Sequence, residues 1–239
     1  NAHPFDENYF KTAAYADVSF ARYSQYWWSN RYYAKLAMRY GPREGKVLEI
    51  GCGLGHLLEW LTVRYQVFGA DINSYAISEA KKNVPEGEFS VLSAEDLSRY
   101  SDQTFQIVIA KHVVEHLQNP ESAIAEMSRI LAPGGLLILA TPNLDSYMRG
   151  IKKERWIGYK DPTHISLKPP AEWTAYLRKH NFRIKRNFSD GFWDAPYISM
   201  IPAKIQKILF GAPGGLQAIL GWSIIPVRMG ESLIILAYR

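Results

Sequence analysis

The fold of this chain is decided by a short apolar segment that runs into closely spaced glycines, Val47-Leu48-Glu49-Ile50-Gly51-Cys52-Gly53-Leu54-Gly55. Glycine lets the backbone turn tightly and approach a ligand without obstruction by a Cβ atom. We therefore expect a buried strand over Lys46–Ile50, a turn, and then a helix over Leu54–Val63. In an open parallel sheet this first strand-to-helix turn lies beyond the carboxyl ends of the strands, where ligands bind.

A nucleotide-binding turn of this kind also needs an acid at the end of the second strand, where a carboxylate can hold ribose hydroxyls. Asp71 stands at that position, in Phe68-Gly69-Ala70-Asp71. The glycines are spaced G-x-G-x-G, whereas a dinucleotide loop prefers G-x-G-x-x-G with room for a pyrophosphate. Glu49 would repel a pyrophosphate but would suit the ammonium group of a methionine moiety. Both features favour S-adenosylmethionine over NAD and argue against an NAD-dependent oxidoreductase.

Strand and helix patterns alternate from Gly45 onward, which predicts βαβ units and a parallel sheet. We expect further strands at Gln66–Ala70, Glu88–Leu92, Phe105–Ala110, Leu136–Ala140, Phe182–Asn187 and Glu231–Tyr238, and helical segments at Ser74–Lys82, His112–Leu117, Pro120–Leu131 and Ala171–His180. The predicted fold is α/β: a Rossmann-like, doubly wound, mostly parallel seven-stranded sheet with an antiparallel C-terminal strand. One domain would span residues 1–239, with a helical cap at 1–44, a core at 45–190 and 231–239, and an insertion at 191–230.

The cap is rich in aromatic side chains whose spacing near three and four residues predicts one or two amphipathic helices. These side chains either pack on the core or line a substrate pocket. They are Tyr9, Phe10, Tyr15, Phe20, Tyr23, Tyr26, Trp27, Trp28, Tyr32 and Tyr33.

The insertion contains a stretch without charge, from Ile208 to Val227, that is interrupted by Pro213-Gly214-Gly215. Such breakers argue against a membrane-spanning helix. We expect two short amphipathic helices that form a lid. Contact with a membrane surface through residues 204–228 is the second interpretation, with four candidate residues: Trp222, Lys204, Lys207 and Arg228.

Composition bounds the kind of protein. The chain has 239 residues, of which 47% are hydrophobic, and a net charge of +5; these values suit one globular domain with a sizeable core. The mild positive charge would help it approach RNA, an anionic membrane or an acidic substrate, although the basic residues are scattered.

Cys52 is the single cysteine, which excludes an internal disulfide and a cysteine-based zinc cluster. No signal-peptide pattern is seen, so we expect a cytoplasmic location.

Several stretches, taken as a set, resemble the successive motifs of class I S-adenosylmethionine-dependent methyltransferases, and above all the broad group that includes ubiquinone-biosynthesis O-methyltransferases. They are Glu49–Gly55, Asp71, Ser93-Ala94-Glu95-Asp96-Leu97, Phe105–Leu117 and Arg129-Ile130-Leu131-Ala132-Pro133-Gly134-Gly135-Leu136.

The resemblance implies S-adenosylmethionine as cofactor and S-adenosylhomocysteine as product. It also implies that the glycines line the cofactor, that Asp71 binds its ribose, that Ile72 packs on the adenine and that Ala94-Glu95 lie at the adenine edge. Relatives often carry Asp where Ser93 stands. The full set of expected cofactor-binding residues is Glu49, Gly51, Cys52, Gly53, Gly55, Asp71, Ile72, Ala94, Glu95 and Lys111.

Ionisable side chains follow the fourth strand, where the methyl-transfer site should lie. His112, Glu115 and His116 stand at i, i+3 and i+4 on one face of a helical turn, and Asp161-Pro162-Thr163-His164 adds an acid and a histidine. A histidine with a pKa of about 6.5 can accept the proton of a hydroxyl acceptor. His116 and His164 are the main candidates for this catalytic role, followed by His112.

Two other interpretations of the same residues stay open. Some relatives carry a Glu-x-x-Glu-His run and a later histidine that bind a divalent cation, so His112, Glu115, His116 and His164 are candidate metal ligands. Because His112 replaces the first Glu, the imidazoles would suit zinc, iron or manganese better than magnesium. Alternatively these residues only hold loops in place, and proximity alone drives transfer.

The sequence therefore predicts methyl transfer from S-adenosylmethionine to a small organic acceptor. This assignment requires that the glycine turn and Asp71 lie close together in space. The acceptor atom is expected to be oxygen, on a phenol, a glycosyl group or a lipid-linked molecule. RNA methylation is one alternative, and a non-catalytic cofactor-binding protein with the same fold is another.

Overall fold

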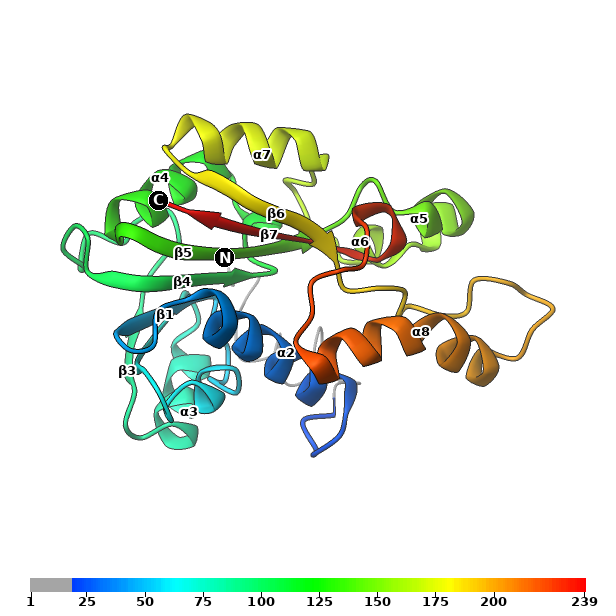
Figure 1. Cartoon of the computed structure of the whole chain (residues 1–239), viewed down its shortest axis with the longest axis horizontal. Helices are drawn as coiled ribbons and strands as arrows, with labels where there is room; N and C mark the ends of the chain where they lie inside the picture. Colours follow the sequence, from blue (N-terminus) through cyan, green and yellow to red (C-terminus); the bar gives the residue numbers. More distant parts are fainter. Residues whose placement is uncertain (1–18) are drawn as a thin grey trace.

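The structure is a computed structural model that describes residues 19–239. It contains a seven-stranded sheet in the order β3-β2-β1-β4-β5-β7-β6 (Figure 1). The strands are β1 (Lys46–Ile50), β2 (Gln66–Asp71), β3 (Glu88–Val91), β4 (Phe105–Lys111), β5 (Leu131–Pro142), β6 (Arg183–Ser189) and β7 (Ser232–Tyr238). Only β7 runs antiparallel to its neighbours, β5 and β6, so the predicted fold class is confirmed.

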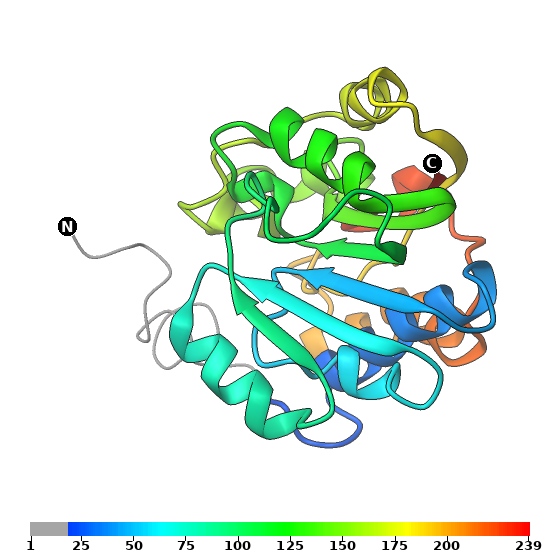
Figure 2. The same cartoon turned by 90° about the vertical axis from the view of Figure 1, so that its left-hand side faces the viewer.

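Helices cover both faces of the sheet (Figure 2). They are α2 (Gln25–Tyr40), α3 (Ser74–Asn83), α4 (Pro120–Ile130), α5 (Tyr147–Lys152), α6 (Ile157–Lys160), α7 (Pro170–Lys179) and α8 (Ala203–Leu220), with short 3-10 helices η1 (Leu58–Trp60), η2 (Val114–His116), η3 (Lys153–Arg155) and η4 (Val227–Met229). Alternate strand residues face opposite layers: Val47 packs with α2 and α3, whereas Leu48 packs with α4 and α7.

The strand order places one ligand-binding crevice, between the ends of β1 and β4. The chain leaves β1 toward β2 and β3 and then crosses back to place β4 on the other side of β1. At such a reversal the connections after β1 and β4 leave in opposite directions, which opens a ligand-binding crevice at their carboxyl ends. The glycine turn that follows β1 and the Lys111–His116 segment that follows β4 therefore meet at the same edge.

The N-terminal prediction is confirmed as far as the structure describes it. One helix, α2, carries Tyr32 and Tyr33 as buried side chains. Its first turn is capped by Ser24, whose side chain accepts a hydrogen bond from the Trp27 N–H, as expected for a serine at this position. Tyr9, Phe10 and Tyr15 lie outside the described residues.

The prediction of a regular helix over Leu54–Val63 is wrong. Only η1 forms there, within turns that mix i+3 and i+4 hydrogen bonds, such as Leu61 N to Leu58 O and Thr62 N to Leu58 O. Trp60 is drawn instead into an aromatic contact with Trp27, with ring centroids 5.1 Å apart. Packing against α2 therefore overrides the local helical pattern.

The two short helices predicted in the insertion are also wrong, because α8 is one helix of 18 residues with Pro213 inside it. Gly214, directly after Pro213, serves close packing rather than a break. A Cβ atom on Gly214 would lie 2.4 Å from the carbonyl oxygen of Asp190, so only glycine lets α8 approach the end of β6.

Two smaller predictions also change. Strand β5 begins at Leu131 and includes the predicted turn at Pro133-Gly134-Gly135, with a shift of register against β4. The segment from His112 to Leu117 forms only the 3-10 turn η2, and His112 itself has a left-handed φ of 54°. The structure adds α5, η3 and α6, which the sequence pattern did not predict.

Candidate active site

The glycine turn lies directly against the end of β2. Gly53 N donates a hydrogen bond to Asp71 Oδ2 at 2.9 Å, and Asn73 N donates to Asp71 Oδ1 at 2.9 Å. Gly51 N and Cys52 N both donate to the carbonyl oxygen of Ala70. The two parts of the predicted nucleotide-binding signature are therefore neighbours in space, as the sequence argument required.

Gly51 is the position where glycine is indispensable. Its φ is +68°, a left-handed value that residues with a Cβ rarely adopt. A Cβ atom there would lie 2.4 Å from Cγ2 of Val113. The segment after β4 is thus packed against the turn after β1, which brings the predicted cofactor turn and the predicted reactive residues together.

Two buried charged groups face this junction. Glu49, at the end of β1, is 4% exposed, and among the described residues its Oε2 has no hydrogen-bond partner. Burial raises the pKa of Glu49 against the attraction of Lys111. An orphaned carboxylate oxygen beside a ligand turn is costly unless a donor arrives. The ammonium group of a methionine moiety is such a donor, so the residues present fit the implied cofactor.

Lys111, at the end of β4, is enclosed by α2. Its Nζ donates to Asn30 Oδ1 at 2.8 Å and lies 5.1 Å from the ring centroids of Tyr26 and Tyr33. Burial lowers the pKa of Lys111, while Glu49 and Asp190 oppose this shift. The cap helix therefore forms a wall of the junction, next to the predicted site.

The other predicted cofactor residues surround the same edge. Ile72 is 44% exposed just after Asp71, and Ala94 is buried while Glu95 accepts a hydrogen bond from Asn119 N at its Oε1. Cys52 is buried, and this burial raises the pKa of its thiol. A protonated, buried thiol agrees with packing rather than with a nucleophilic role.

Beyond the junction, Glu115, His116 and His164 form a cluster in which one ligand atom from each residue lies within 4.8 Å of the others. The two imidazole rings have centroids 4.7 Å apart. Glu115 is fully buried, and among the described residues its Oε2 has no hydrogen-bond partner. The loop that carries His164 docks through a hydrogen bond from Ser166 N to the Glu115 carbonyl oxygen.

Hydrogen bonds orient both rings. Nδ1 of His116 lies 2.8 Å from Thr163 Oγ1, and Nδ1 of His164 lies 2.7 Å from the carbonyl oxygen of Gly158. Because the Thr163 hydroxyl donates to Asp161 Oδ1, it accepts from His116. A proton on Nδ1 therefore satisfies both rings and makes Nε2 the basic nitrogen of each neutral imidazole.

The charge states follow from burial and neighbours. Burial lowers the pKa of His116, although the charge of Glu115 opposes the shift. Burial alone would raise the pKa of Glu115, but the hydrogen bond and charge of His112 and the charge of His116 leave it below its ordinary value. At neutral pH the cluster thus holds a carboxylate beside a neutral, basic imidazole.

His112 is not one of the three clustered residues, and with a left-handed φ of 54° it does not continue the helical turn that was expected to carry His112, Glu115 and His116. Its Nδ1 lies 3.0 Å from Glu115 Oε1, and its Nε2 lies 3.4 Å from Ser232 Oγ. Its left-handed backbone turns the ring toward the start of β7. His112 therefore contacts the cluster through Glu115 only.

Sequence reasoning missed Asp190, which follows β6. Asp190 Oδ1 accepts from Ser232 N at 2.9 Å, and its Oδ2 accepts from Trp193 Nε1 at 2.7 Å. Burial raises the pKa of Asp190 against these hydrogen bonds. Asp190 directly follows the observed strand β6, which ends at Ser189, but the strand was predicted to end at Asn187, so the signal that identified Asp71 was displaced by the misplaced boundary.

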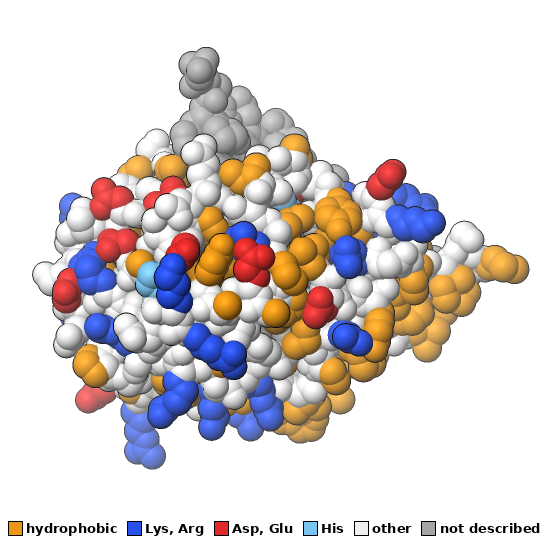
Figure 3. All heavy atoms as spheres, turned by 90° about the horizontal axis from the view of Figure 1, so that it is seen from above, with side chains coloured by type: hydrophobic (Ala, Val, Ile, Leu, Met, Phe, Trp, Pro, Cys, Tyr) orange, Lys and Arg blue, Asp and Glu red, His pale blue; other side chains and the backbone are white. Residues whose placement is uncertain are grey.

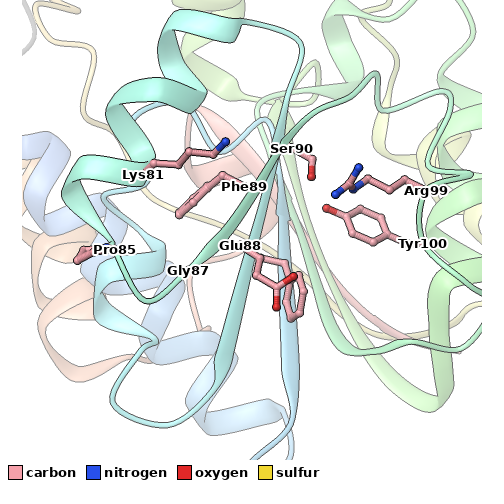
Figure 4. A pocket seen from close by; sticks show the side chains of 9 residues that line it. Lys81, Pro85, Gly87, Glu88, Phe89, Ser90, Arg99 and Tyr100 are labelled. Carbon is pink, nitrogen blue, oxygen red and sulfur yellow. The ribbon is translucent and has the colours of Figure 1, made fainter.

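The hollow of about 440 Å³ shown in Figure 4 lies elsewhere, beside edge strand β3. Lys81, Glu88, Arg99 and Tyr100 are among its lining side chains. Glu88 begins β3, so this hollow is toward the amino end of the strand, away from the crevice.

Comparison with known proteins agrees with this geometry. A family model described as a methyltransferase domain matches residues 20–186. The chain belongs to this family of class I S-adenosylmethionine-dependent methyltransferases. The family implies S-adenosylmethionine as the cofactor.

Individual relatives differ in name. A ubiquinone biosynthesis O-methyltransferase of Mesorhizobium japonicum is 33% identical over 122 residues, covering 46% of this chain and 49% of the relative. A probable S-adenosylmethionine-dependent methyltransferase of Mycobacterium tuberculosis is 30% identical over 204 residues, covering 78% of this chain and 69% of the relative. The chain spans about half the length of the ubiquinone O-methyltransferases that it matches.

A solved structure shares the fold. The S-adenosylmethionine-dependent methyltransferase of Archaeoglobus fulgidus superposes with a TM-score of 0.61 at 22% identity, covering 87% of this chain and 94% of that chain. At this identity the likeness concerns the fold alone.

Proposed function

We propose that this chain transfers the methyl group of S-adenosylmethionine to a hydroxyl oxygen of a small aromatic acceptor. The observation that carries the proposal is the Glu115–His116–His164 cluster, which stands next to the glycine turn through the Val113–Gly51 contact. The names of the ubiquinone O-methyltransferases support an oxygen acceptor. A phosphatidylethanolamine N-methyltransferase of Cereibacter sphaeroides, 30% identical over 136 residues, is also a relative.

In this proposal the residues after β1 and β2 hold the cofactor. Glu49 Oε2 would accept a hydrogen bond from the ammonium group. The Asp71 carboxylate oxygens would accept hydrogen bonds from the ribose hydroxyls, because each oxygen has a lone pair that its backbone contact does not use. Ile72 and the Ala94-Glu95 pair border the adenine. Gly51, Gly53 and Gly55 admit the ligand close to the backbone. The bound cofactor supplies an activated methyl group on a sulfonium.

The acceptor side would be formed by the cap helix and the cluster. Tyr26 and Tyr33 of α2 flank Lys111; Tyr33 is buried, whereas the partly exposed Tyr26 would contact an aromatic ring. The acceptor oxygen would receive this methyl group, and the electron pair of the former carbon–sulfur bond would stay with the sulfur of the departing S-adenosylhomocysteine. The hydroxyl proton passes to Nε2 of His116, which Glu115 stabilises once it is charged.

The same three side chains would also hold a divalent cation. Two imidazoles and one carboxylate are a donor set that suits iron, zinc or manganese better than magnesium. A proton on Nδ1 of each histidine, hydrogen-bonded to the protein, is the usual support of a metal-binding imidazole. We assign proton transfer to His116 itself. A loss of activity on chelation would instead indicate that the cluster binds a metal ion.

Thermal denaturation with ligands tests the cofactor assignment. S-adenosylhomocysteine at one hundred times its Kd should stabilise the fold by about 2.7 kcal/mol, whereas NAD should have no effect. Glu49→Gln should weaken this binding by about tenfold or more, because a charged partner is lost. Glu44→Gln, the same change at an exposed position, is the matched control. Stabilisation by NAD alone would contradict the proposal.

Radiolabelled methyl transfer tests the reaction. The enzyme is incubated with labelled S-adenosylmethionine and a panel of phenols and catechols, and the product is analysed for an O-methyl group. Label found on nitrogen, or on RNA in preference to every phenol, would overturn the oxygen assignment.

A further inference from the structure

Helix α8 has its polar and apolar faces reversed relative to an ordinary surface helix. Its buried residues are Gln206 and Gln217, whereas Ile208 and Leu209 are 72% and 62% exposed. The exposed residues recur at intervals of three and four, so they form one continuous face. We call this face the apolar stripe; it consists of Ile205, Ile208, Leu209, Leu216, Ile219 and Leu220.

Hydrogen bonds fix the orientation of the helix. Gln217 Nε2 donates to the Ser189 carbonyl oxygen at 2.8 Å, and its Oε1 accepts from Ile224 N and Ile225 N. Gln206 makes four such bonds, to the backbone of Tyr197, Ile198 and Ile201. Rotating α8 to bury the stripe would break all of these buried bonds. The stripe is therefore held outward.

Other exposed apolar side chains extend the stripe within the same insertion. They are Ile198, Met200, Trp222, Ile224 and Met229. Figure 3 shows hydrophobic side chains gathered at the end of the molecule where Figure 1 places the start of α8, with basic side chains close by. A contiguous apolar surface of this kind on a folded protein marks an interaction site.

The charges of the insertion favour an anionic partner surface. The acid of the insertion, Asp194, is paired with Lys152. From Ala195 to Gly230 the sequence contains Lys204, Lys207 and Arg228 but no Asp or Glu. Both lysines are exposed in the first turns of α8. A second copy of the chain offers no acidic residue from this segment to pair with them, whereas the headgroups of an anionic bilayer do.

The described residues contain no helix that is long and apolar enough to cross a membrane. The two glutamines hold one side of α8 to the protein, so only the opposite side can meet lipid. An amphipathic helix with an apolar face and flanking lysines lies in the plane of a membrane interface.

We propose that the apolar stripe inserts into the headgroup region of an anionic phospholipid bilayer, with Lys204 and Lys207 contacting the phosphates. This surface would hold the crevice beside the membrane, where a poorly water-soluble acceptor is concentrated. The inference concerns a different surface from the active-site cluster, and its test needs no methyl transfer.

Co-sedimentation with vesicles tests the proposal on the full chain. Vesicles of phosphatidylcholine with phosphatidylglycerol should bind the protein at least about tenfold more strongly than phosphatidylcholine alone, and high salt should reduce the difference. Ile208→Ser with Leu209→Ser should lower the vesicle partition coefficient by about tenfold or more, since apolar insertion is lost. Lys204→Gln with Lys207→Gln should remove most of the preference for phosphatidylglycerol.

A matched pair controls for added charge. Ile208→Glu should abolish vesicle binding, whereas Val63→Glu, at a position 83% exposed and outside the insertion, should leave it unchanged. Thermal midpoints and S-adenosylhomocysteine binding report whether each variant is folded. Equal binding by wild type and the Ile208→Ser, Leu209→Ser variant would overturn the proposal. So would a dimer, seen by light scattering, that Ile208→Glu dissociates.

Discussion

Single residues set the chemistry of the crevice, and Gly51 shows how little freedom some of them have. Its left-handed φ and its contact with Val113 exclude any side chain. Gly51→Ala should destabilise the fold by about 2–4 kcal/mol and abolish S-adenosylhomocysteine binding. Chemical denaturation and calorimetry measure both effects.

The control is Gly150→Ala, because Gly150 lies in α5 with nothing within 4 Å of an added Cβ. In a helix this change should be neutral or stabilising by about 0.5–1 kcal/mol. An equal effect of both substitutions would mean that the close approach at Gly51 has no special role.

His116 should dominate the pH dependence of turnover. Burial lowers its pKa below 6.5, so the base stays unprotonated at neutral pH and the acid limb of the kcat profile should lie below pH 6.5. His116→Gln should reduce kcat by about 10²–10⁴-fold and remove that limb. Affinity for S-adenosylhomocysteine should stay unchanged.

A chelator separates base catalysis from metal catalysis at the same residues. If His116 is the proton acceptor, dialysis against EDTA should leave kcat unchanged. A loss of activity restored by zinc, iron or manganese would assign the Glu115–His116–His164 cluster to a cation instead.

Among the elements, α8 depends on buried amide side chains for its position. Gln217→Leu removes three hydrogen bonds and leaves the N–H groups of Ile224 and Ile225 without their acceptor. We expect a loss of about 2–4 kcal/mol in the free energy of unfolding, measured in urea. Gln66→Leu, at an exposed position, should change stability by less than about 0.5 kcal/mol.

The elements also show where sequence reasoning holds. Strands β1 to β4 were predicted because glycines, prolines and acids bound short apolar runs, and these signals are local. The break predicted at Pro213-Gly214-Gly215 failed because Gly214 packs against the carbonyl oxygen of Asp190, a residue far earlier in the sequence. Local pattern cannot reveal a close approach made across the fold.

The candidate site divides in the same way. Asp71 and the glycine turn were paired correctly because parallel strands place their carboxyl ends at one edge. Asn30 and Asp190 reach that edge from α2 and from the end of β6, and no spacing rule connects them to Lys111 or Ser232. His112 left the expected face because its φ is +54°, a conformation that helical spacing does not anticipate.

For the whole molecule, buried ionisable groups should make stability depend on pH. The pKa of His116 is lowered in the folded state, so below about pH 6.5 the unfolded chain binds more protons at this residue. The contribution of His116 to the free energy of unfolding is fully present above pH 6.5 and is lost as the pH falls through the lowered pKa of the folded state. His116→Gln should flatten this part of the stability curve, as measured by urea denaturation between pH 5 and pH 7.

The order of β6 and β7 has a consequence for how this protein can diversify. The two strands are antiparallel neighbours, and the Asp190–Ser232 hydrogen bond joins the points where the insertion departs and returns. The insertion between the two strands can lengthen, shorten or be exchanged while the sheet keeps its register. New acceptors or new docking sites can thus be acquired by replacing one loop, with the cofactor end of the enzyme left intact.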